Sequence, residues 1–297
     1  MNGRGVTRAG GPGAAATSGP EVLELRVAGR PVASYTTRPD LSARHAPRPY
    51  LHPVTTLAGV RVSELLPADH PHHLGVSVAV PDVAGHNFWG GRTFVRDQGP
   101  TELANHGTQR HERFGRLGPD GFTEELSWTA GGGVVLREER TLRVRALAKT
   151  AWALDVAFAL TDATGAGVSI GSPATNGRPG AAYGGFFWRA PKEPAAPHVF
   201  GAAGDGEAAV HGGRGDWVAL AGQGWTLVFA GADEETRSDP WFVRAAEYPG
   251  VGSSLAHERR LEIPAGGTAV RRVVTVVADG RLDRARAAAL VREAVTS

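Results

Sequence analysis

The feature that most constrains the fold is an alternation of apolar and polar residues in short segments. The first of these, "EVLELRV" (residues 21–27), places Leu23, Leu25 and Val27 on one face and Glu24 and Arg26 on the other. A period of two is typical of a half-buried β-strand. The pattern recurs in "GVSVAV", "VVLREERTLRVRA", "TAWALDVAFALT", "DWVALAG", "GWTLVFAG", "RRLEIPAG" and "TAVRRVVTVVAD", with turn-forming residues between the runs. The sequence therefore predicts a protein made largely of strands and turns.

Only the C-terminus has a helical pattern. In "DGRLDRARAAALVREAVTS" (residues 279–297), helix-forming residues follow Asp279 or Asp283, either of which is a suitable N-cap. The expected apolar stripe consists of Leu282, Ala285, Ala289 and Val291. Many strands, one terminal helix and no alternation of strands with helices predict an all-β fold, a large antiparallel β-sandwich with a short C-terminal helix.

Domain organisation follows from the composition along the chain. Residues 1–20 contain almost nothing to bury and are expected to form a flexible N-terminal tail. Residues 21–297 show no internal repeat and no linker, which favours a single β-sandwich domain.

Composition excludes several classes of function. The chain has no cysteine, so disulfides, thiolate nucleophiles and cysteine-ligated metals are excluded. The formal net charge is only +2, and no run of five like charges occurs, so we expect no nucleic-acid partner. No secretory h-region and no run of eighteen apolar residues is present, so we expect a cytoplasmic protein without a membrane partner.

Histidine is concentrated in one part of the chain. Eight of the eleven histidines fall between residues 45 and 111: His45, His52, His70, His72, His73, His86, His106 and His111. Imidazole titrates near neutral pH and is the commonest metal ligand, so such clustering favours a functional site over a set of surface side chains.

The densest part of this region is "DHPHH", residues 69–73. Pro71 excludes a regular helix through it, and in an extended segment His70 and His72 would point to one side while Asp69 and His73 point to the other. We expect His70 and His72 to be catalytic acid–base groups oriented by Asp69, or to be ligands of one divalent metal ion. The alternative is a solvated polar strand end.

Two further segments supply candidates for the same site. In "RPYLHPV" (residues 48–54), Arg48 and Tyr50 are candidates for binding substrate oxygens, and His52 is a candidate catalytic group. Arg48 could instead neutralise a buried acid. We expect His111 to join the catalytic residues and His73 to contact the substrate.

Aromatic residues beside glycine, arginine and asparagine indicate a sugar pocket, because aromatic faces stack on the C–H faces of a sugar ring while polar groups bind its hydroxyls. "HNFWGG" contributes Asn87 and Trp89 as substrate-binding candidates, and "YGGFFWR" contributes Trp188 and Arg189. Trp89 could equally be core filling. Tyr183 and the segment "DPWFVRAAEYPG", with Trp241, Arg244 and Glu247, extend the same aromatic character.

Paired carboxylates, the signature of a glycosidase, are not selected by any spacing in the chain. Glu138 and Glu139 lie in an alternating segment, so one faces the interior and one faces solvent, but the pattern leaves open which is which. No Gly-x-Ser-x-Gly motif and no phosphate-binding loop is present.

The motifs "RPYLHPV", "DHPHHLGVSVAVPDVAGHNFWGG" and "YGGFFWR" resemble the bacterial PmoA-like family, whose label "methane oxygenase" is a misnomer. The resemblance implies a β-supersandwich of the galactose-mutarotase type and a partnership with sugar-type NAD-dependent oxidoreductases. The signature positions it carries over are Arg48, Tyr50, His52, Pro53, Asp69, His70, Pro71, His72, His73, Gly75, Asn87, Phe88, Trp89 and Gly90.

Three hypotheses follow for function. The leading one is a carbohydrate-active enzyme that processes a sugar or an oxidised (keto) glycoside by histidine acid–base chemistry, in a hydrolysis, elimination or epimerisation that requires no cofactor. The second is a metal-dependent enzyme with one divalent ion held by histidine and carboxylate. The third is a non-catalytic carbohydrate-binding protein.

Overall fold

The computed structural model describes residues 22–202 and 204–296. The tail expected at residues 1–20 lies outside the described residues. All pairings between the named strands are antiparallel, which confirms the predicted all-β antiparallel sandwich with a short C-terminal helix.

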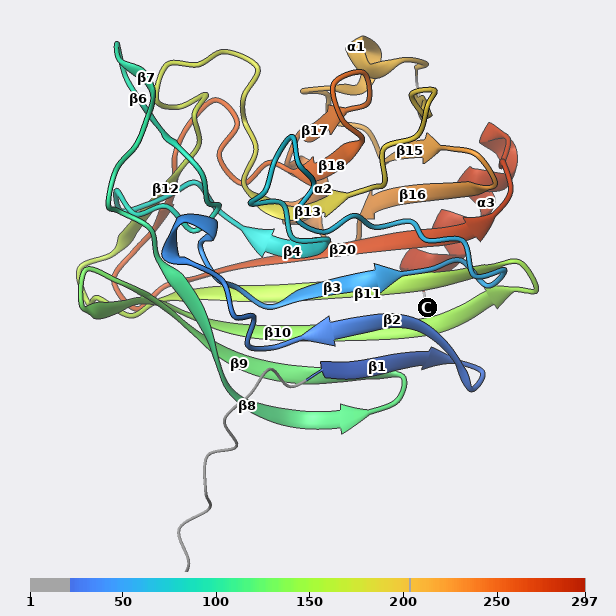
Figure 1. Cartoon of the computed structure of the whole chain (residues 1–297), viewed down its shortest axis with the longest axis horizontal. Helices are drawn as coiled ribbons and strands as arrows, with labels where there is room; N and C mark the ends of the chain where they lie inside the picture. Colours follow the sequence, from blue (N-terminus) through green and yellow to red (C-terminus); the bar gives the residue numbers. More distant parts are fainter. Residues whose placement is uncertain (1–21, 203, 297) are drawn as a thin grey trace, which may run out of the picture.

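Two large sheets form the two layers (Figure 1). The seven-stranded sheet has the order β1 (Val22–Val27), β2 (Arg30–Thr36), β3 (Tyr50–Val54), β4 (Val76–Ala79), β13 (Gly185–Arg189), β18 (Gly250–Ser253) and β17 (Trp241–Arg244). The eight-stranded sheet has the order β14 (His198–Gly201), β15 (Trp217–Ala221), β16 (Trp225–Gly231), β20 (Thr268–Asp279), β11 (Ala151–Asp162), β10 (Gly133–Ala148), β9 (Gly121–Ala130) and β8 (Thr108–Gly118).

Smaller elements complete the fold. A three-stranded sheet has the order β19 (Leu261–Ile263), β12 (Val168–Gly171) and β5 (Asp82–Val83), and a hairpin joins β6 (Thr93–Val95) to β7 (Gly99–Thr101). Short helical turns occur at η1 (Ala43–His45), α1 (Glu207–Val210) and α2 (Glu234–Ser238). No helix among the described residues is long and apolar enough to cross a bilayer.

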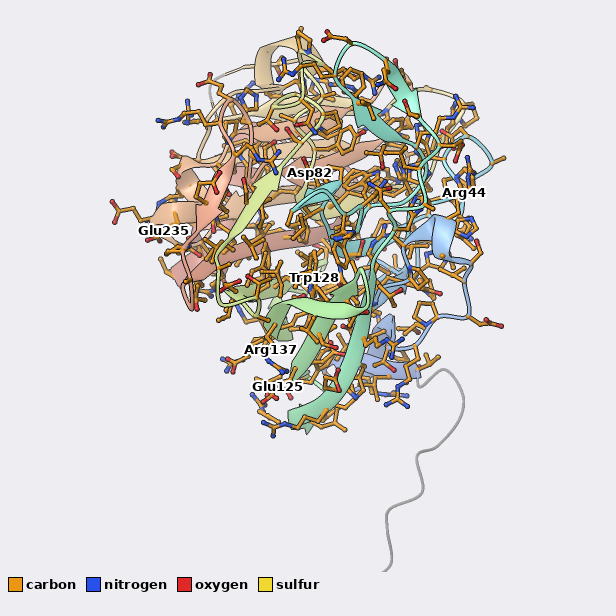
Figure 2. The ribbon with its side chains drawn as sticks, turned by 90° about the vertical axis from the view of Figure 1, so that its left-hand side faces the viewer. Arg44, Asp82, Glu125, Trp128, Arg137 and Glu235 are labelled. Atoms are coloured by element: carbon orange, nitrogen blue, oxygen red, sulfur yellow. The ribbon has the colours of Figure 1, made fainter. Side chains whose placement is uncertain are left out.

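The core lies between the two large sheets and draws on both, from Leu25 in β1 to Val277 in β20. Alternation decides which side chains enter it. On β10, Glu138 is 2% exposed while Glu139 faces solvent, so the inward member of that pair is Glu138. Figure 2 shows the same alternation, with Trp128 inside and Arg137 and Glu125 at the surface.

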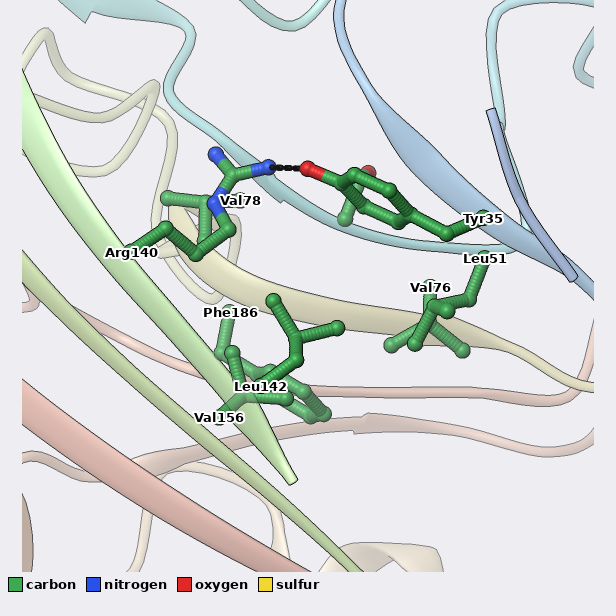
Figure 3. A pocket seen from close by; sticks show the side chains of 9 residues that line it. Tyr35, Leu51, Val76, Val78, Arg140, Leu142, Val156 and Phe186 are labelled. Carbon is green, nitrogen blue, oxygen red and sulfur yellow. Dashed lines mark hydrogen bonds between the residues drawn. The ribbon is translucent and has the colours of Figure 1, made fainter. Parts of the chain in front are cut away.

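A buried polar network ties the sheets together at the centre of the core. The Nη1 group of Arg140 (β10) donates to the hydroxyl of Tyr35 (β2) at 3.1 Å, across the interface of the two sheets (Figure 3). The Nε group of Arg140 donates to Glu138 at 2.7 Å, and the indole of Trp128 donates to the same carboxylate at 2.7 Å. Burial alone would lower the pKa of Arg140, but the charge of Glu138 raises it.

The C-terminal helix α3 (Arg284–Thr296) packs on the outer face of the eight-stranded sheet. Asp283 is its N-cap, because its Oδ1 accepts from the amide of Arg286 at 2.7 Å, whereas Asp279 accepts from Ala58. The expected apolar stripe was wrong in detail. The buried face follows the i, i+3, i+4, i+7 spacing of a helix and consists of Ala287, Leu290, Val291 and Ala294.

Candidate functional site

The "DHPHH" segment is not extended, and the expectation that His70 and His72 share a side opposite His73 was wrong. The amide of His70 donates to Pro67 at 3.0 Å and that of His73 donates to His70 at 2.9 Å, so the segment forms two successive turns. Pro71 occupies the second position of the turn 70–73, where its fixed φ is favoured. The proline that excludes a helix therefore folds the segment back on itself.

These turns gather three imidazoles. The rings of His70 and His73 stack with centroids 4.6 Å apart and planes 16° apart, and His72 meets His73 edge-on at 4.9 Å. The three imidazoles pack against aromatic residues of the seven-stranded sheet and its loops. Tyr248 lies 4.5 Å from His70, and Trp89 lies 5.6 Å from His73.

An ion pair between Arg189 and Asp69 lies next to the imidazoles. Arg189, at the end of β13, is fully buried, and its Nη2 donates to both oxygens of Asp69 at 3.1 and 3.0 Å. Asp69 Oδ2 in turn lies 3.2 Å from Nδ1 of His70, within ion-pair distance but outside hydrogen-bond alignment. The arrangement is a carboxylate that is fixed by an arginine and lies within ion-pair distance of an imidazole.

His73 has its own contact with the same arginine, whose Nη1 lies 3.4 Å from its Nδ1. Because a guanidinium can only donate, Nδ1 of His73 must be the unprotonated nitrogen of the neutral ring. The proton of that ring is then on Nε2, so His73 presents an N–H group on the side away from Arg189.

The "HNFWGG" loop holds the cluster from the other side. Asn87 is buried and its Oδ1 accepts from the amides of Trp89 and Gly90, both at 2.8 Å, so it shapes the loop. A Cβ atom at Gly90 would lie 2.8 Å from Cβ of His72, and one at Gly91 would lie 2.9 Å from the His72 ring. The glycine pair is what lets His72 approach this backbone so closely.

The imidazoles form one wall of a cavity of about 150 Å³. Its lining is aromatic and polar: His70, His72, His73, Trp89, Arg178, Ala181, Tyr183, Phe242, Arg244, Glu247 and Tyr248. Since about 10–15 Å³ of such space is enough for one water molecule, the cavity has room for a small polar molecule. Neither the hydroxyl of Tyr183 nor that of Tyr248 has a hydrogen-bond partner in the described part of the chain.

Burial and nearby charge lower the pKa of two of the imidazoles, His72 and His73. Burial, followed by the charge of Arg48, lowers the pKa of His72 to about 3. Burial and the neighbouring imidazoles lower the pKa of His73 well below its ordinary value. For Asp69, burial opposes ionisation, but the hydrogen bonds and charge of Arg189 outweigh it and lower the pKa. At neutral pH His72 and His73 are therefore neutral, and the carboxylate of Asp69 is ionised.

Several residues expected at the site lie in its framework instead of the cavity wall. Arg48 is fully buried, and its guanidinium donates to Ser77 and to carbonyls that include those of Trp89 and His72. It fastens the two loops that carry the cavity wall. The side chain of Asn87 likewise forms hydrogen bonds within its own loop and with Thr93.

Trp188 and Arg189 were both expected at the substrate, but adjacent strand residues point to opposite faces. Trp188 points into the core between the sheets, where its indole donates to Val62 at 2.7 Å. Arg189 points to the outer face of the sheet, where Phe187 also contributes to the aromatic cluster. Only Arg189 therefore belongs with the site, and it acts through Asp69.

His52, His111 and Tyr50 do not line the cavity. His52 lies on β3 with its Nδ1 2.9 Å from the hydroxyl of Ser63. His111 is buried in β8 with its Nδ1 2.6 Å from Oε1 of Glu124, so it extends the network of Tyr35 and Arg140.

Across the described ranges, no group of three or more histidine, aspartate or glutamate side chains is arranged to hold a metal ion. The ring centroids of His70 and His72, the pair expected to ligate a metal, are 5.9 Å apart. Any ion bound there would need ligands beyond the side chains of this cluster.

The sequence did not single out Arg178, Phe242 or Tyr248 as site residues. Phe242 and Tyr248 lie in the segment "DPWFVRAAEYPG", whose aromatic character was noted, but more than a hundred residues from the histidines, and Arg178 lies in the loop before β13. Phe242 and Tyr248 reach the cavity because the sheet order places β18 and β17 next to β13.

The family model of DUF6807, a family of unknown function, matches residues 22–292. The chain belongs to the DUF6807 family. Among curated proteins, none matches the chain. The matched region contains the whole sandwich and every residue that lines the cavity, so the site described here lies within the DUF6807 domain.

Proposed function

We propose that this DUF6807 protein is a carbohydrate-active enzyme that binds one sugar or keto-sugar unit in the imidazole-walled cavity and acts on it by proton transfer. The observation that carries the proposal is the Arg189–Asp69–His70 arrangement at the wall of a small polar cavity with aromatic sides. A carboxylate behind an imidazole fixes its tautomer and raises its basicity.

Within this proposal His70 is the general base, in preference to His72. Oδ2 of Asp69 lies 3.2 Å from Nδ1 of His70, and a small rotation of the ring would align a hydrogen bond that keeps the proton on Nδ1 and leaves Nε2 free to accept a proton. His72, whose pKa is lowered to about 3, is too weak a base to compete near neutral pH. His72 then serves as a neutral hydrogen-bonding wall of the cavity.

The reaction that fits these groups best starts on a carbon next to a keto group. Nε2 of His70 takes the proton from that carbon, and the electron pair moves into the C–C bond and onto the carbonyl oxygen. The Nε2–H group of His73 and the free phenols of Tyr183 and Tyr248 are donors for this oxyanion. Return of the proton to the opposite face gives epimerisation, and loss of an oxygen substituent from the next carbon gives elimination.

Solvent-deuterium exchange tests the proton-transfer step before any product is known. The full chain is incubated in D₂O with monosaccharides, methyl glycosides and their keto derivatives, and ¹H NMR follows loss of the C–H signal next to the carbonyl. We expect catalysed exchange with a keto sugar and a loss of at least 100-fold in H70Q. The matched control is H198Q, since His198 is exposed and does not line the cavity.

The non-catalytic alternative gives a different result in the same samples. A binding protein would show quenching of tryptophan fluorescence by a sugar, through Trp89, but no exchange and no product with any compound. Exchange that is equal in wild type, H70Q and H198Q would also contradict the proposal.

A further inference from the structure

A second cavity lies away from the imidazole cluster, between the end of β18 and the start of β19. Its volume is about 300 Å³, and it shares no lining residue with the cavity of His70, His72 and His73. We call it the Ser254–His257 groove, after two of the residues that line it. Ser254 is fixed there by its amide, which donates to Pro240 at 3.0 Å.

Two buried polar atoms of this groove have no partner. Ser254 is 1% exposed, and its Oγ makes no hydrogen bond with the described residues. Nδ1 of His257 is also buried and unpartnered. The other edge of the His257 ring packs on Gly212, where a Cβ atom would lie 3.3 Å from Nε2. An unsatisfied buried donor is costly, so a group that accepts from both atoms would be stabilised.

Arginine side chains line the same groove. Arg259 has no ion pair or hydrogen bond with the described residues, and Arg214 uses only its Nε, which donates to Ser238 at 2.9 Å. The buried acid of the groove, Asp239, is already paired with Arg271 through contacts of 2.7 and 3.2 Å. Glu258 is the one unpaired acid in the lining, which leaves a surplus of free guanidinium groups.

We propose that the Ser254–His257 groove is a binding site for a small oxyanion, a phosphate or a carboxylate group. The hydroxyl of Ser254 and the Nδ1–H group of His257 donate to its oxygens, and Arg214 and Arg259 supply the compensating charge. A cation is disfavoured by the guanidinium groups, and a neutral ligand leaves them unused. The site is separate from the proposed proton-transfer site and does not depend on it.

Calorimetric titration of the full chain with sodium phosphate, and separately with sodium acetate, tests the inference. We expect saturable binding of at least one of the two anions. Stronger binding of phosphate identifies a tetrahedral oxyanion as the ligand group, and equal or stronger binding of acetate identifies a carboxylate. Absence of binding by both anions would overturn the proposal.

Three variants localise the binding. S254A and R259Q are each expected to weaken it by about tenfold or more, since each removes a donor to a charged acceptor. R137Q is the matched control, because Arg137 is an exposed arginine on the outer face of β10, and it should bind as wild type does. If S254A fails to fold, R259Q still decides the question, because Arg259 is exposed.

Binding by H72Q distinguishes the two cavities. Unchanged anion binding in H72Q supports a separate groove. Loss of anion binding in H72Q, together with retained binding in R259Q, would place the anion at the imidazole cluster and overturn the assignment.

Discussion

Arg189 donates from its Nη2 to both oxygens of Asp69, at 3.1 and 3.0 Å, while its Cζ lies 4.7 Å from the ring centroid of Tyr248. One buried side chain of β13 thus anchors the histidine turn and supports an aromatic wall of the cavity. The turn that carries the imidazoles is fixed to the sandwich through this contact.

The Arg189–Asp69 pair is expected to contribute to stability as well as to position. R189M leaves the carboxylate without its partner, and we expect it to lower the free energy of unfolding by about 1–3 kcal/mol, because Asp69 keeps some solvent contact. Urea unfolding of R189M, D69N and the double variant gives the coupling energy. The exposed pair Arg116–Asp120 serves as the control cycle and should show coupling below about 0.5 kcal/mol. Equal coupling in both cycles would contradict the anchoring role.

The buried imidazoles should make stability depend on pH. The pKa of His72 is about 3 and that of His73 is also lowered, so between these values and the ordinary value near 6.5 the unfolded chain binds more protons than the folded one. Stability is therefore unaffected above about pH 6.5 and falls as the pH drops below it. From pH 7 to pH 5 the loss is about 2 kcal/mol for His72, and the lowered pKa of His73 acts in the same direction.

Urea unfolding at pH 7 and pH 5 measures this loss. The lowered pKa of Asp69 acts at lower pH, outside this window. Between pH 7 and pH 5, the free energy of unfolding of H72Q should fall by about 2 kcal/mol less than that of wild type. The free energy of unfolding of H198Q, changed at an exposed histidine, should fall by as much as that of wild type. The prediction is wrong if the two variants have the same pH dependence.

Local patterns predicted the strands and one helix cap, because both depend on neighbouring residues. Alternation placed Leu25 and Val27 in the core, and a short polar side chain before an alanine-rich run identified Asp283 as one of two N-cap candidates. The pattern could not choose between Glu138 and Glu139, since a shift of one residue reverses the buried face.

The site was less predictable because it depends on contacts between distant segments. The grouping of His70, His72 and His73 was visible, but their arrangement was not, since Pro71 is compatible with both an extended segment and a turn. Tyr248 joins them only through the pairing of β13 with β18, and no local pattern specifies which strands pair.

The network between the sheets should dominate the energetics of the core. R140M removes the partner of Glu138, which is 2% exposed and would be left as an uncompensated buried charge. We expect it to lower the free energy of unfolding by about 3–5 kcal/mol. R137M, on the opposite face of the same strand, should change it by less than about 0.5 kcal/mol. Chemical unfolding compares the two, and equal effects of R140M and R137M would contradict the dominant role of this network.

The close approach of His72 to the glycine pair gives the sharpest test of the geometry of the cavity. G90A places a Cβ atom 2.8 Å from Cβ of His72 and 2.9 Å from the carbonyl oxygen of His45, at a φ of +102°. G85A also has a positive φ, +85°, but meets nothing within 4 Å. Both variants carry backbone strain of about 1–2 kcal/mol, and only G90A adds overpacking of about 1–3 kcal/mol. Thermal unfolding should therefore separate them, and G90A should also lose the deuterium exchange that G85A retains, because the clash moves an imidazole out of the cavity wall. Equal destabilisation by G90A and G85A would mean that His72 can shift without cost. The glycine loop would then not fix the position of the imidazole.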